Sequence, residues 1–194
     1  SDFSFMRRPV LWLEAITKFR GTITSAPNFA YEHLLREDVV SDADLASLDL
    51  RSVECMMNAS EPVRCETMTR FADRFARCGL SPDAVTAAYG LAEATLTVSQ
   101  GGRRQLAVNA DLLWQGRLQI DSAPRADSAL LASCGRPLDG LDVRIVDPQD
   151  GRPVPEDRIG EVWLRHSSTR SQQRTGPPRI PPRPPSEVAQ ARGV

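Results

Sequence analysis

Two stretches in the first half of the chain carry apolar residues at helical spacing. Residues 7–22 place large apolar side chains about one turn apart, and Pro9 suits the first turn of such a helix. A second stretch repeats the pattern at i, i+3, i+4 and i+7, with Met68, Phe71, Ala72 and Phe75. Gly21 and Gly79 stand where these two helices should end. Residues 29–38 predict a further helix.

Short apolar runs lie between these helices and have the length of strands. They are "TITSAPN" (22–28), "SVECMMNA" (52–59) and "AVTAAYG" (84–90). Strands that alternate with helices predict an α/β fold with a mostly parallel sheet. After residue 96 the pattern changes, because residues 141–165 alternate apolar and polar side chains on both sides of a Pro/Asp/Gly turn. This alternation predicts an antiparallel hairpin, so the α/β layer leads into a β-rich segment.

Composition excludes several classes of protein. The 194 residues carry a net charge of −1, which gives no general electrostatic attraction to nucleic acid or to an acidic membrane. No apolar run approaches the length of a transmembrane helix, and the N-terminus lacks the apolar core of a signal peptide. The four cysteines include no C-x-x-C pair, which argues against zinc and favours free thiols. We therefore expect a cytoplasmic protein without an integral membrane segment or a nucleic-acid partner.

Polar side chains follow two of the predicted strands, where α/β proteins bind their ligands. The first cluster is "NASEPVR", from Asn58, in which residues 60–62 have the composition of a tight turn that would lie over a flat ring. The second is "YGLAEAT", in which Tyr89 offers an aromatic face and Gly90 allows close backbone approach. Glu93 is a carboxylate able to hold Mg²⁺ against phosphate oxygens. An ordinary turn from strand to helix would also contain a Tyr-Gly pair, so only the combination indicates a nucleotide site.

Taken together, the two clusters resemble motifs of the adenylate-forming ligases, which include acyl-CoA synthetases, luciferases and peptide-synthetase adenylation domains. "YGLAEATL" is similar to their Tyr-Gly-x-Thr-Glu motif, and "NASEPVR" is similar to their Gly-Ala-Glu-Pro-like adenine segment. "CGRPLDGLDVRIVDPQDGRPVPEDRIGEVWL" resembles the stretch that leads into their β-rich subdomain. The order and spacing of all three agree over residues 5–165. The resemblance implies part of the N-terminal domain of such a ligase, with the start of its β-rich subdomain.

Within this superfamily the chain looks most like the fatty acyl-AMP ligases. "APNFAYE", "EATL" and Ala92 in place of the usual threonine have the character of that branch. Between Glu93 and Gly135 lie 41 residues, where coenzyme A ligases have a shorter link. The resemblance implies an acyl-AMP-ligase insertion, thought to disfavour coenzyme A as acceptor; a lineage-specific loop is the alternative. The implied segments are a partial α/β adenylation subdomain (1–98), the insertion (99–133), the start of the β-rich subdomain (134–165) and a tail (166–194).

The resemblance also implies a reaction, in which a fatty acid and ATP give an acyl-adenylate and pyrophosphate, with Mg²⁺ as the metal cofactor. The acyl group would pass to an acyl carrier protein, or to coenzyme A if the chain came from a long-chain acyl-CoA ligase; either places the chain in lipid metabolism. Glu93 would be the catalytic residue that holds Mg²⁺. The acyl group would lie near Asn28, Phe29 and Ala30. The nucleotide would contact Asn58, Ala59, Ser60, Glu61, Pro62, Tyr89, Gly90, Leu91 and Ala92.

Several parts of such an active site are not found in this sequence. No Ser/Thr/Gly-rich phosphate loop precedes the first cluster, and no ribose-binding aspartate or catalytic lysine follows Trp163. Lys18, the single lysine beside 23 arginines, lies on the first predicted helix. We therefore expect an internal fragment of a ligase that is inactive by itself.

Residues 166–194 are rich in proline and arginine and almost free of large apolar side chains, so we expect them to be disordered or polyproline-like. Read in a shifted frame, Thr169 to Ser186 permit the Tyr-Trp pair, the acidic residue and the Phe that the family carries after "GEVW". A frameshifted ligase gene is one hypothesis for this tail. The other takes "PPRIPPRPP" at face value as a ligand for an SH3-like domain, which would make the chain a non-catalytic interaction protein.

Overall fold

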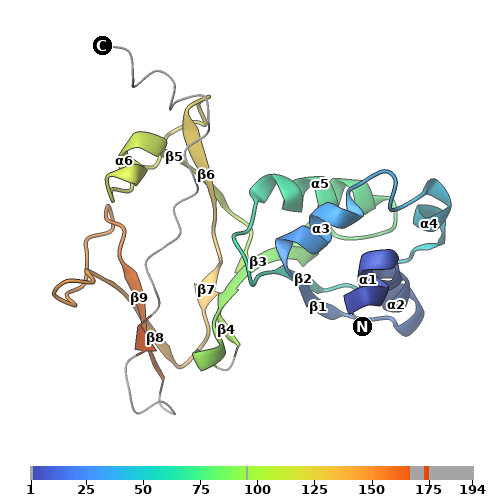
Figure 1. Ribbon diagram of the computed structural model, residues 1–194, viewed down its shortest axis with the longest axis horizontal. Coiled ribbons are helices and arrows are strands. Elements are labelled where there is room, and N and C mark those ends of the chain that lie inside the picture. Colours follow the sequence, from blue (N-terminus) through green and yellow to red (C-terminus); the bar gives the residue numbers. More distant parts are fainter. Residues whose placement is uncertain (1, 95, 167–172, 175–194) are drawn as a thin grey trace.

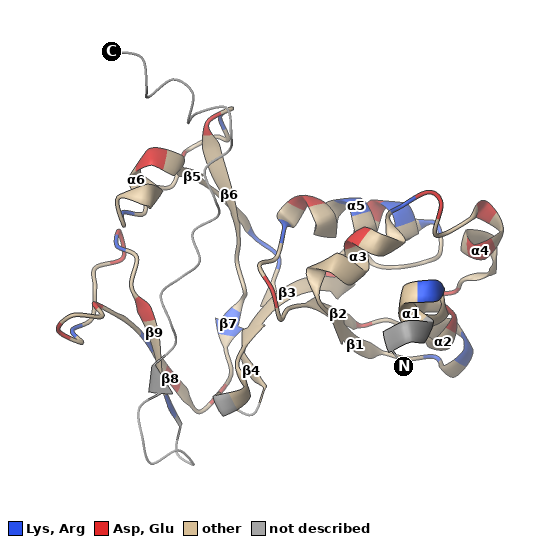
Figure 2. Ribbon diagram, viewed as in Figure 1, with Lys and Arg blue, Asp and Glu red and all other residues tan. Residues whose placement is uncertain are grey.

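The computed structural model describes residues 2–94, 96–166 and 173–174. They form an α/β layer and, beside it, a β-rich part with two smaller antiparallel sheets (Figure 1). Helices and strands alternate up to Gly90, as the sequence predicts, and strands dominate from Thr97 onward. Acidic and basic side chains are interspersed over both parts (Figure 2).

The elements follow one another closely along the chain. The helices are α1 (Asp2–Arg7), α2 (Leu11–Phe19), α3 (Asn28–Leu34), α4 (Asp42–Ser47), α5 (Cys65–Ala76) and α6 (Ala110–Trp114), with the 3₁₀ turns η1 (Pro82–Ala84) and η2 (Ala92–Ala94). The strands are β1 (Ile23–Ala26), β2 (Cys55–Asn58), β3 (Val85–Gly90), β4 (Thr97–Gly102), β5 (Gln105–Asn109), β6 (Ser128–Ala132), β7 (Arg136–Pro137), β8 (Leu141–Val146), β9 (Glu161–His166) and β10 (Gln173–Arg174).

The main sheet has five strands in the order β1-β2-β3-β4-β7. β1, β2 and β3 run parallel, with Ala26 opposite Asn58 and Asn58 opposite Ala87. β4 returns antiparallel to β3, and β7 lies antiparallel to β4. The prediction of a mostly parallel sheet therefore holds for the first three strands only. The link from β3 to β4 is too short for the crossover that a parallel pairing needs.

The core lies between the parallel strands and the helices that cover them. Phe71 and Phe75 of α5 are fully buried, as the predicted apolar stripe requires, and their ring centroids are 4.5 Å apart. Tyr31 of α3 meets Phe71 edge to face at 4.9 Å. Its hydroxyl donates to the carbonyl of Met57 at 2.9 Å, and burial raises the pKa of Tyr31 well above its ordinary value. Full burial of one such apolar side chain stabilises the fold by about 1.5–3 kcal/mol.

The first predicted helix is shorter than residues 7–22, and its end differs from the prediction. α2 begins at Leu11, because Pro9 lies in the turn before it. Arg20, and not Gly21, takes the left-handed conformation after the helix, with φ 55°. The N–H of Gly21 then donates to the carbonyl of Ile16 at 3.1 Å, which satisfies one of the last carbonyls of the helix.

The apolar pattern does not predict α1, α4 or α6. Each has only five or six residues, which is little more than one turn and too short to show a period. α4 is fixed instead by a capping box, in which the Ser41 hydroxyl accepts from the N–H of Asp44 and the Asp44 carboxylate accepts from the N–H of Ser41.

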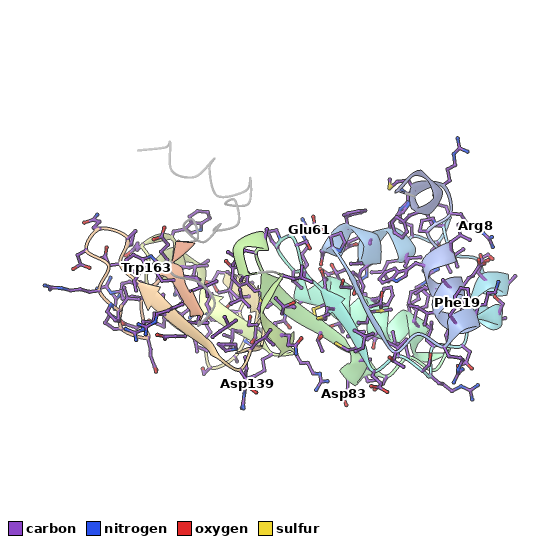
Figure 3. All side chains as sticks on the ribbon, turned by 90° about the horizontal axis from the view of Figure 1, so that it is seen from below. Arg8, Phe19, Glu61, Asp83, Asp139 and Trp163 are labelled. Atoms are coloured by element: carbon purple, nitrogen blue, oxygen red, sulfur yellow. The ribbon has the colours of Figure 1, made fainter. Side chains whose placement is uncertain are left out.

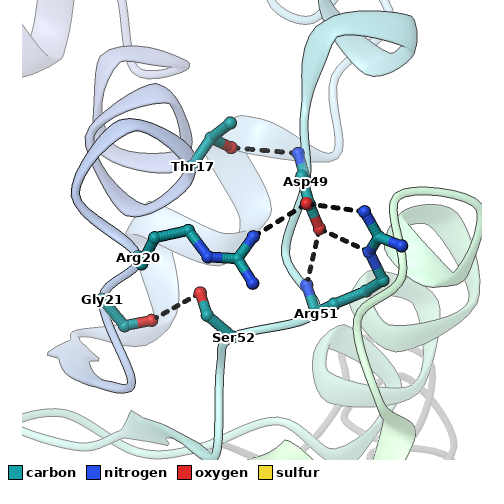
Figure 4. Close-up of polar contacts among 6 residues, drawn as sticks. All are labelled: Thr17, Arg20, Gly21, Asp49, Arg51 and Ser52. Atoms are coloured by element: carbon teal, nitrogen blue, oxygen red, sulfur yellow. Dashed lines mark hydrogen bonds and ion pairs between the residues drawn. The ribbon is translucent and has the colours of Figure 1, made fainter.

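One carboxylate with several donors holds the turn between α4 and β2 against α2 (Figure 4). Asp49 accepts from the guanidinium of Arg20 at 2.8 Å, and from the backbone N–H and guanidinium of Arg51 at 2.8–3.1 Å. Its own N–H donates to the hydroxyl of Thr17 at 3.1 Å. Hydrogen bonds from Arg51, with Arg20 beside it, hold the pKa of Asp49 well below its ordinary value.

The β-rich part consists of two antiparallel units that contact each other. β5 and β6 pair with each other and are joined by α6 and a long loop, and β8 and β9 form the hairpin predicted for residues 141–165. The N–H of Leu118 donates to the carbonyl of Asp157 at 2.8 Å, and that of Ile159 to Gly116 at 3.0 Å. The segment at 99–133 therefore contacts the β8–β9 connection; its assignment as an insertion, like the other segment boundaries, stays a prediction.

Little of the C-terminal tail can be compared with its prediction. The prediction that residues 166–194 are disordered is wrong for His166, which ends β9, and for Gln173 and Arg174, which form β10 and pair with β9; the other residues of the tail lie outside the described residues. The four cysteines are free thiols, at Cys55, Cys65, Cys78 and Cys134. No helix in the described ranges is long and apolar enough to cross a membrane.

Candidate functional site

Three parallel strands end at one edge of the main sheet, and a predicted polar segment follows each of them. Asn28 comes after β1, residues 59–62 come after β2, and Leu91 comes after β3. Glu61 lies at the opposite edge from Asp83, which precedes β3 (Figure 3). We call the edge that carries Glu61 the strand-end edge. It is the position at which open α/β sheets bind their ligands.

The loop at residues 59–64, the nucleotide loop of the sequence prediction, turns sharply after β2. Ser60 has φ 72°, in the left-handed region that residues other than glycine seldom adopt. The N–H of Ala59 donates to the carbonyl of Ala26 at 3.2 Å, which continues the contact between β1 and β2 beyond their last paired residues. Residues 60–62 are exposed. The expected turn is thus present, and its side chains are open to solvent.

The start of α3 is bonded to this loop and to Asn58, the residue that precedes it. The N–H of Phe29 donates to Oε1 of Glu61 at 2.5 Å. The N–H of Arg64 donates to Oδ1 of Asn28 at 3.1 Å, and Nδ2 of Asn58 donates to the same oxygen at 2.9 Å. The structure therefore brings together residues that the sequence assigns to the acyl side, on α3, and to the nucleotide side, on the loop.

The three residues expected near the acyl group differ in exposure. Phe29 is 49% exposed, and its ring meets that of Phe5 edge to face at 6.4 Å. Asn28 and Ala30 are only 5% and 3% exposed. Of the three, only Phe29 is exposed to solvent. Their role beside an acyl group stays a prediction.

Thr67 and Glu32 belong to the same polar cluster, and the sequence predicted neither. The hydroxyl of Thr67, fully buried on α5, donates to the carboxylate of Glu32 and accepts from Nδ2 of Asn28 at 3.4 Å. The sequence does hold a signal, because Thr67 precedes Phe71 by one turn and so interrupts the apolar stripe of α5. A polar residue on the inward face of a helix indicates a buried hydrogen-bond network.

Tyr89 and Gly90 end β3 beside the antiparallel strand β4. Tyr89 is half-buried and lies opposite Ser99, and Gly90 lies opposite Thr97. A Cβ at Gly90 would lie 1.9 Å from the carbonyl oxygen of Leu96, so only glycine fits where β4 begins. The backbone that approaches Gly90 closely is therefore the chain's own, and the role of Gly90 beside a nucleotide stays a prediction.

The remaining predicted residues follow β3 directly. Leu91 is half-buried, Ala92 is exposed, and Glu93 belongs to η2, although its side chain lies outside the described part of the chain. No group of three or more His, Cys, Asp or Glu side chains among the described residues could hold a metal ion. A single carboxylate still fits Mg²⁺, which keeps several waters and binds proteins through one or two carboxylates together with substrate phosphates.

A family model matches most of the chain. It is that of the AMP-binding enzymes, and it covers residues 2–171. The chain belongs to the AMP-binding enzyme family. Membership of this family confirms the resemblance to adenylate-forming ligases that the three sequence motifs indicate.

Curated relatives of this AMP-binding chain include two ligases of fatty acids. The medium-chain-fatty-acid–[acyl-carrier-protein] ligase TtuA of Teredinibacter turnerae is 39% identical over 168 residues, which cover 84% of this chain and 26% of that protein. The long-chain-fatty-acid–AMP ligase FadD26 of Mycobacterium tuberculosis is 38% identical over 168 residues, which cover 84% of this chain and 28% of that protein. The chain therefore spans between 26% and 28% of the length of these curated relatives.

Solved structures of the AMP-binding family share the fold. A fatty acid AMP ligase from Legionella pneumophila superimposes with a TM-score of 0.77 at 35% identity, over 85% of this chain and 29% of that one. A fatty acyl-adenylate ligase from the same organism, in complex with acyl adenylate and pyrophosphate, gives 0.77 at 34% identity, over 93% and 31%. These structures confirm the predicted fold class, a part of the N-terminal domain of an adenylate-forming ligase close to the fatty acyl-AMP ligases.

Proposed function

We propose that this chain is an internal part of a fatty acyl-AMP ligase. The carboxylate oxygen of a fatty acid attacks the α-phosphorus of ATP, a bond forms between them, and pyrophosphate leaves. The acyl group of the adenylate then passes to the thiol of an acyl carrier protein, and AMP leaves. The observation that carries the proposal is the strand-end edge, where α3, the nucleotide loop and the end of β3 converge in a member of the AMP-binding family.

The nucleotide is held by the loops that follow β2 and β3. The half-buried ring of Tyr89 stacks on the adenine, and the exposed residues 60–62 line the base together with Ala59, while the fully buried Asn58 supports this loop from β2. Gly90 to Ala92 contribute backbone beside the nucleotide. Glu93 would hold Mg²⁺, which would supply positive charge against the phosphates. Attack on phosphorus requires charge stabilisation more than an acid or a base.

The acid lies on the α3 side of the edge, next to the exposed Phe29. We further propose that residues 99–133 are an insertion that favours an acyl carrier protein over coenzyme A as acceptor. Support comes from the relatives, since TtuA is named as a ligase of fatty acids to acyl carrier protein. The reaction takes place in the cytoplasm.

The test is fatty-acid-dependent exchange of pyrophosphate into ATP by the full-length protein that contains this chain. Tyr89→Ala should raise the KM for ATP about 5- to 150-fold, because stacking of one base on an aromatic ring is worth about 1–3 kcal/mol. Tyr89→Phe keeps the ring and should stay close to the unchanged protein. Phe19→Ala, which removes an exposed ring on α2, is the matched control and should leave the KM for ATP unchanged.

Three results would contradict the proposal. They are exchange that does not require a fatty acid, no exchange by the full-length protein, or a KM for ATP that Tyr89→Ala leaves unchanged. Transfer of the acyl group to carrier protein and to coenzyme A, measured side by side, decides the acceptor. Exchange by residues 1–194 alone would contradict the expectation that this part of the ligase is inactive by itself.

A further inference from the structure

Each hydrogen bond in the polar cluster between α3, α5 and the nucleotide loop has a defined donor and acceptor. The single hydrogen of the Thr67 hydroxyl goes to the carboxylate of Glu32, so the hydroxyl oxygen is left to accept from Nδ2 of Asn28. This contact turns Oδ1 of Asn28 towards the loop. There Oδ1 accepts two hydrogen bonds, from Nδ2 of Asn58 and from the N–H of Arg64. Glu32 and Thr67 thus hold the Asn28 amide from one side, and the N–H of Arg64 holds it from the other.

Burial makes this arrangement hard to exchange for another. Asn58 and Thr67 are fully buried and Asn28 is 5% exposed, so water does not readily replace the bonds between them. Asn58 lies just before the nucleotide loop and Arg64 at its end, and both donate to one oxygen of Asn28. Glu61, in the middle of the loop, accepts from the N–H of Phe29 on the same helix. The start of α3 is therefore bonded to the middle and the end of the loop, and to the residue just before it.

We propose, on the basis of the function proposed above, that Asn28 is a positioning residue that couples the nucleotide loop to the acid-binding side of the site. Thr67 and Glu32 orient its amide. Asn28 itself is buried and touches neither substrate; it acts through the loop at 59–64 and through Phe29, its neighbour on α3. The loop and the start of α3 are then ordered together, so the substrate that binds first orders both sides of the site and each substrate favours the binding of the other.

The decisive variant is Thr67→Val in the full-length protein, because valine keeps the shape of threonine and removes only the hydroxyl. The Asn28 amide loses its orienting partner, so the KM for ATP should rise about 3- to 10-fold, as expected for a hydrogen bond worth about 1 kcal/mol. The mutual effect of the two substrates should be lost, so the KM for ATP no longer depends on the fatty acid concentration. Thr67→Ser restores the hydroxyl and should restore both properties.

Thr69→Val is the matched control, because Thr69 is an exposed residue of the same helix whose hydroxyl donates only to the carbonyl of Cys65. It should leave the KM for ATP and the coupling unchanged. Asn28→Ala should reproduce the effects of Thr67→Val more strongly. If Asn28→Ala does not fold, Thr67→Val alone decides the question.

Hydrogen–deuterium exchange separates this proposal from the proposed function. The N–H of Arg64 should exchange faster in Thr67→Val than in the unchanged protein or in Thr69→Val, with or without substrates. A full-length protein without pyrophosphate exchange, but with this change in protection, would overturn the proposed function and leave the structural coupling in place. An active Thr67→Val variant with unchanged KM, unchanged coupling and unchanged protection at Arg64 would overturn the positioning role, even if its Tm were lower.

Discussion

The α/β layer and the β-rich part differ in how much apolar surface they bury. A continuous cluster of buried side chains extends from Val10 to Val85 and contains the large rings of Tyr31, Phe71 and Phe75. Beyond Thr97, the buried apolar side chains in the described residues are fewer and smaller: Val98, Ala107, Val108, Leu113, Val146 and Leu164. The difference lies in the buried side chains and not in the exposed ones, since large apolar side chains at least 40% exposed occur in both parts: Met6, Phe19, Ile23 and Phe29 in the α/β layer, and Trp114, Ile120, Leu130 and Ile145 beyond Thr97.

This difference places the candidate site in the part of the molecule with a core of its own. The nucleotide loop and α3 rest on packed aromatic rings, whereas β5, β6, β8 and β9 are held mainly by pairing within each unit. A binding site needs rigid support for residues that must hold their positions. The loop at 59–64 has that support, because the hydroxyl of Tyr31 in the core donates to the carbonyl of Met57 on β2, just before the loop.

The largest effect should come from emptying the aromatic core. Phe71→Ala should lower the free energy of unfolding by about 3–5 kcal/mol, because a fully buried ring leaves a cavity. Leu164→Ala, on β9, should cost about 2 kcal/mol, since fewer buried neighbours surround it. Urea unfolding followed by circular dichroism measures both. Phe19→Ala, with a ring 74% exposed, should stay within about 0.5 kcal/mol of the unchanged protein. An equal loss of unfolding free energy in Phe71→Ala and Leu164→Ala would contradict the inferred difference between the two cores.

The next effect concerns the junction of the two parts. Gly90→Ala should lower the free energy of unfolding by about 1–3 kcal/mol, because the added methyl would lie 1.9 Å from the Leu96 carbonyl and would push β4 away from β3. Gly21→Ala is the control, since its Cβ would meet its nearest neighbours at 3.8 Å, an ordinary contact. Thermal unfolding of both variants tests the point. A Gly90→Ala protein as stable as Gly21→Ala would show that β4 is free to shift.

The same two parts show how far the sequence predicts the fold. α5 and the β8–β9 hairpin are predicted because their signals are local, a stripe along one helix and an alternation around one turn. α4 and α6 are not predicted, because one turn of helix shows no period. The antiparallel direction of β4 is missed as well, since strand direction depends on the length of the link before it and not on the composition of the strand.

The sequence likewise predicts the parts of the candidate site that have a local signal and misses those that depend on distant contacts. The segments at 58–64 and 89–95 are found from the sequence because their residue types and order resemble a family motif. The contact of Thr67 with Glu32 joins residues 35 positions apart, and no local pattern pairs them. The burial of Asn28 is missed for the same reason: its partners lie on β2, on α5 and at the end of the nucleotide loop, which meet only in the folded chain.

The smallest effect concerns ion pairs. The two parts differ in how far apart along the chain the paired residues lie. Arg20 and Asp49 are 29 residues apart and tie α2 to the turn before β2. In the β-rich part, the ion pairs within the described residues join residues no more than four apart, such as Arg144 with Asp142. A pair of near neighbours can also form in the unfolded chain, so it adds little to folding. A pair of distant residues forms only on folding.

Asp49→Asn should therefore lower the Tm slightly at pH 7, and Asp142→Asn should leave it unchanged. The pKa of Asp49 is held below its unfolded value, so its contribution is fully present above the unfolded pKa, near 4, and is lost as the pH falls through the folded pKa. The difference in Tm between Asp49→Asn and the unchanged protein should stay constant from neutral pH to about pH 5 and shrink below about pH 4. Thermal scans across this range measure it. A difference that grew towards acid, or an equal one for Asp142→Asn, would mean that sequence separation does not decide which of these surface pairs stabilise the fold.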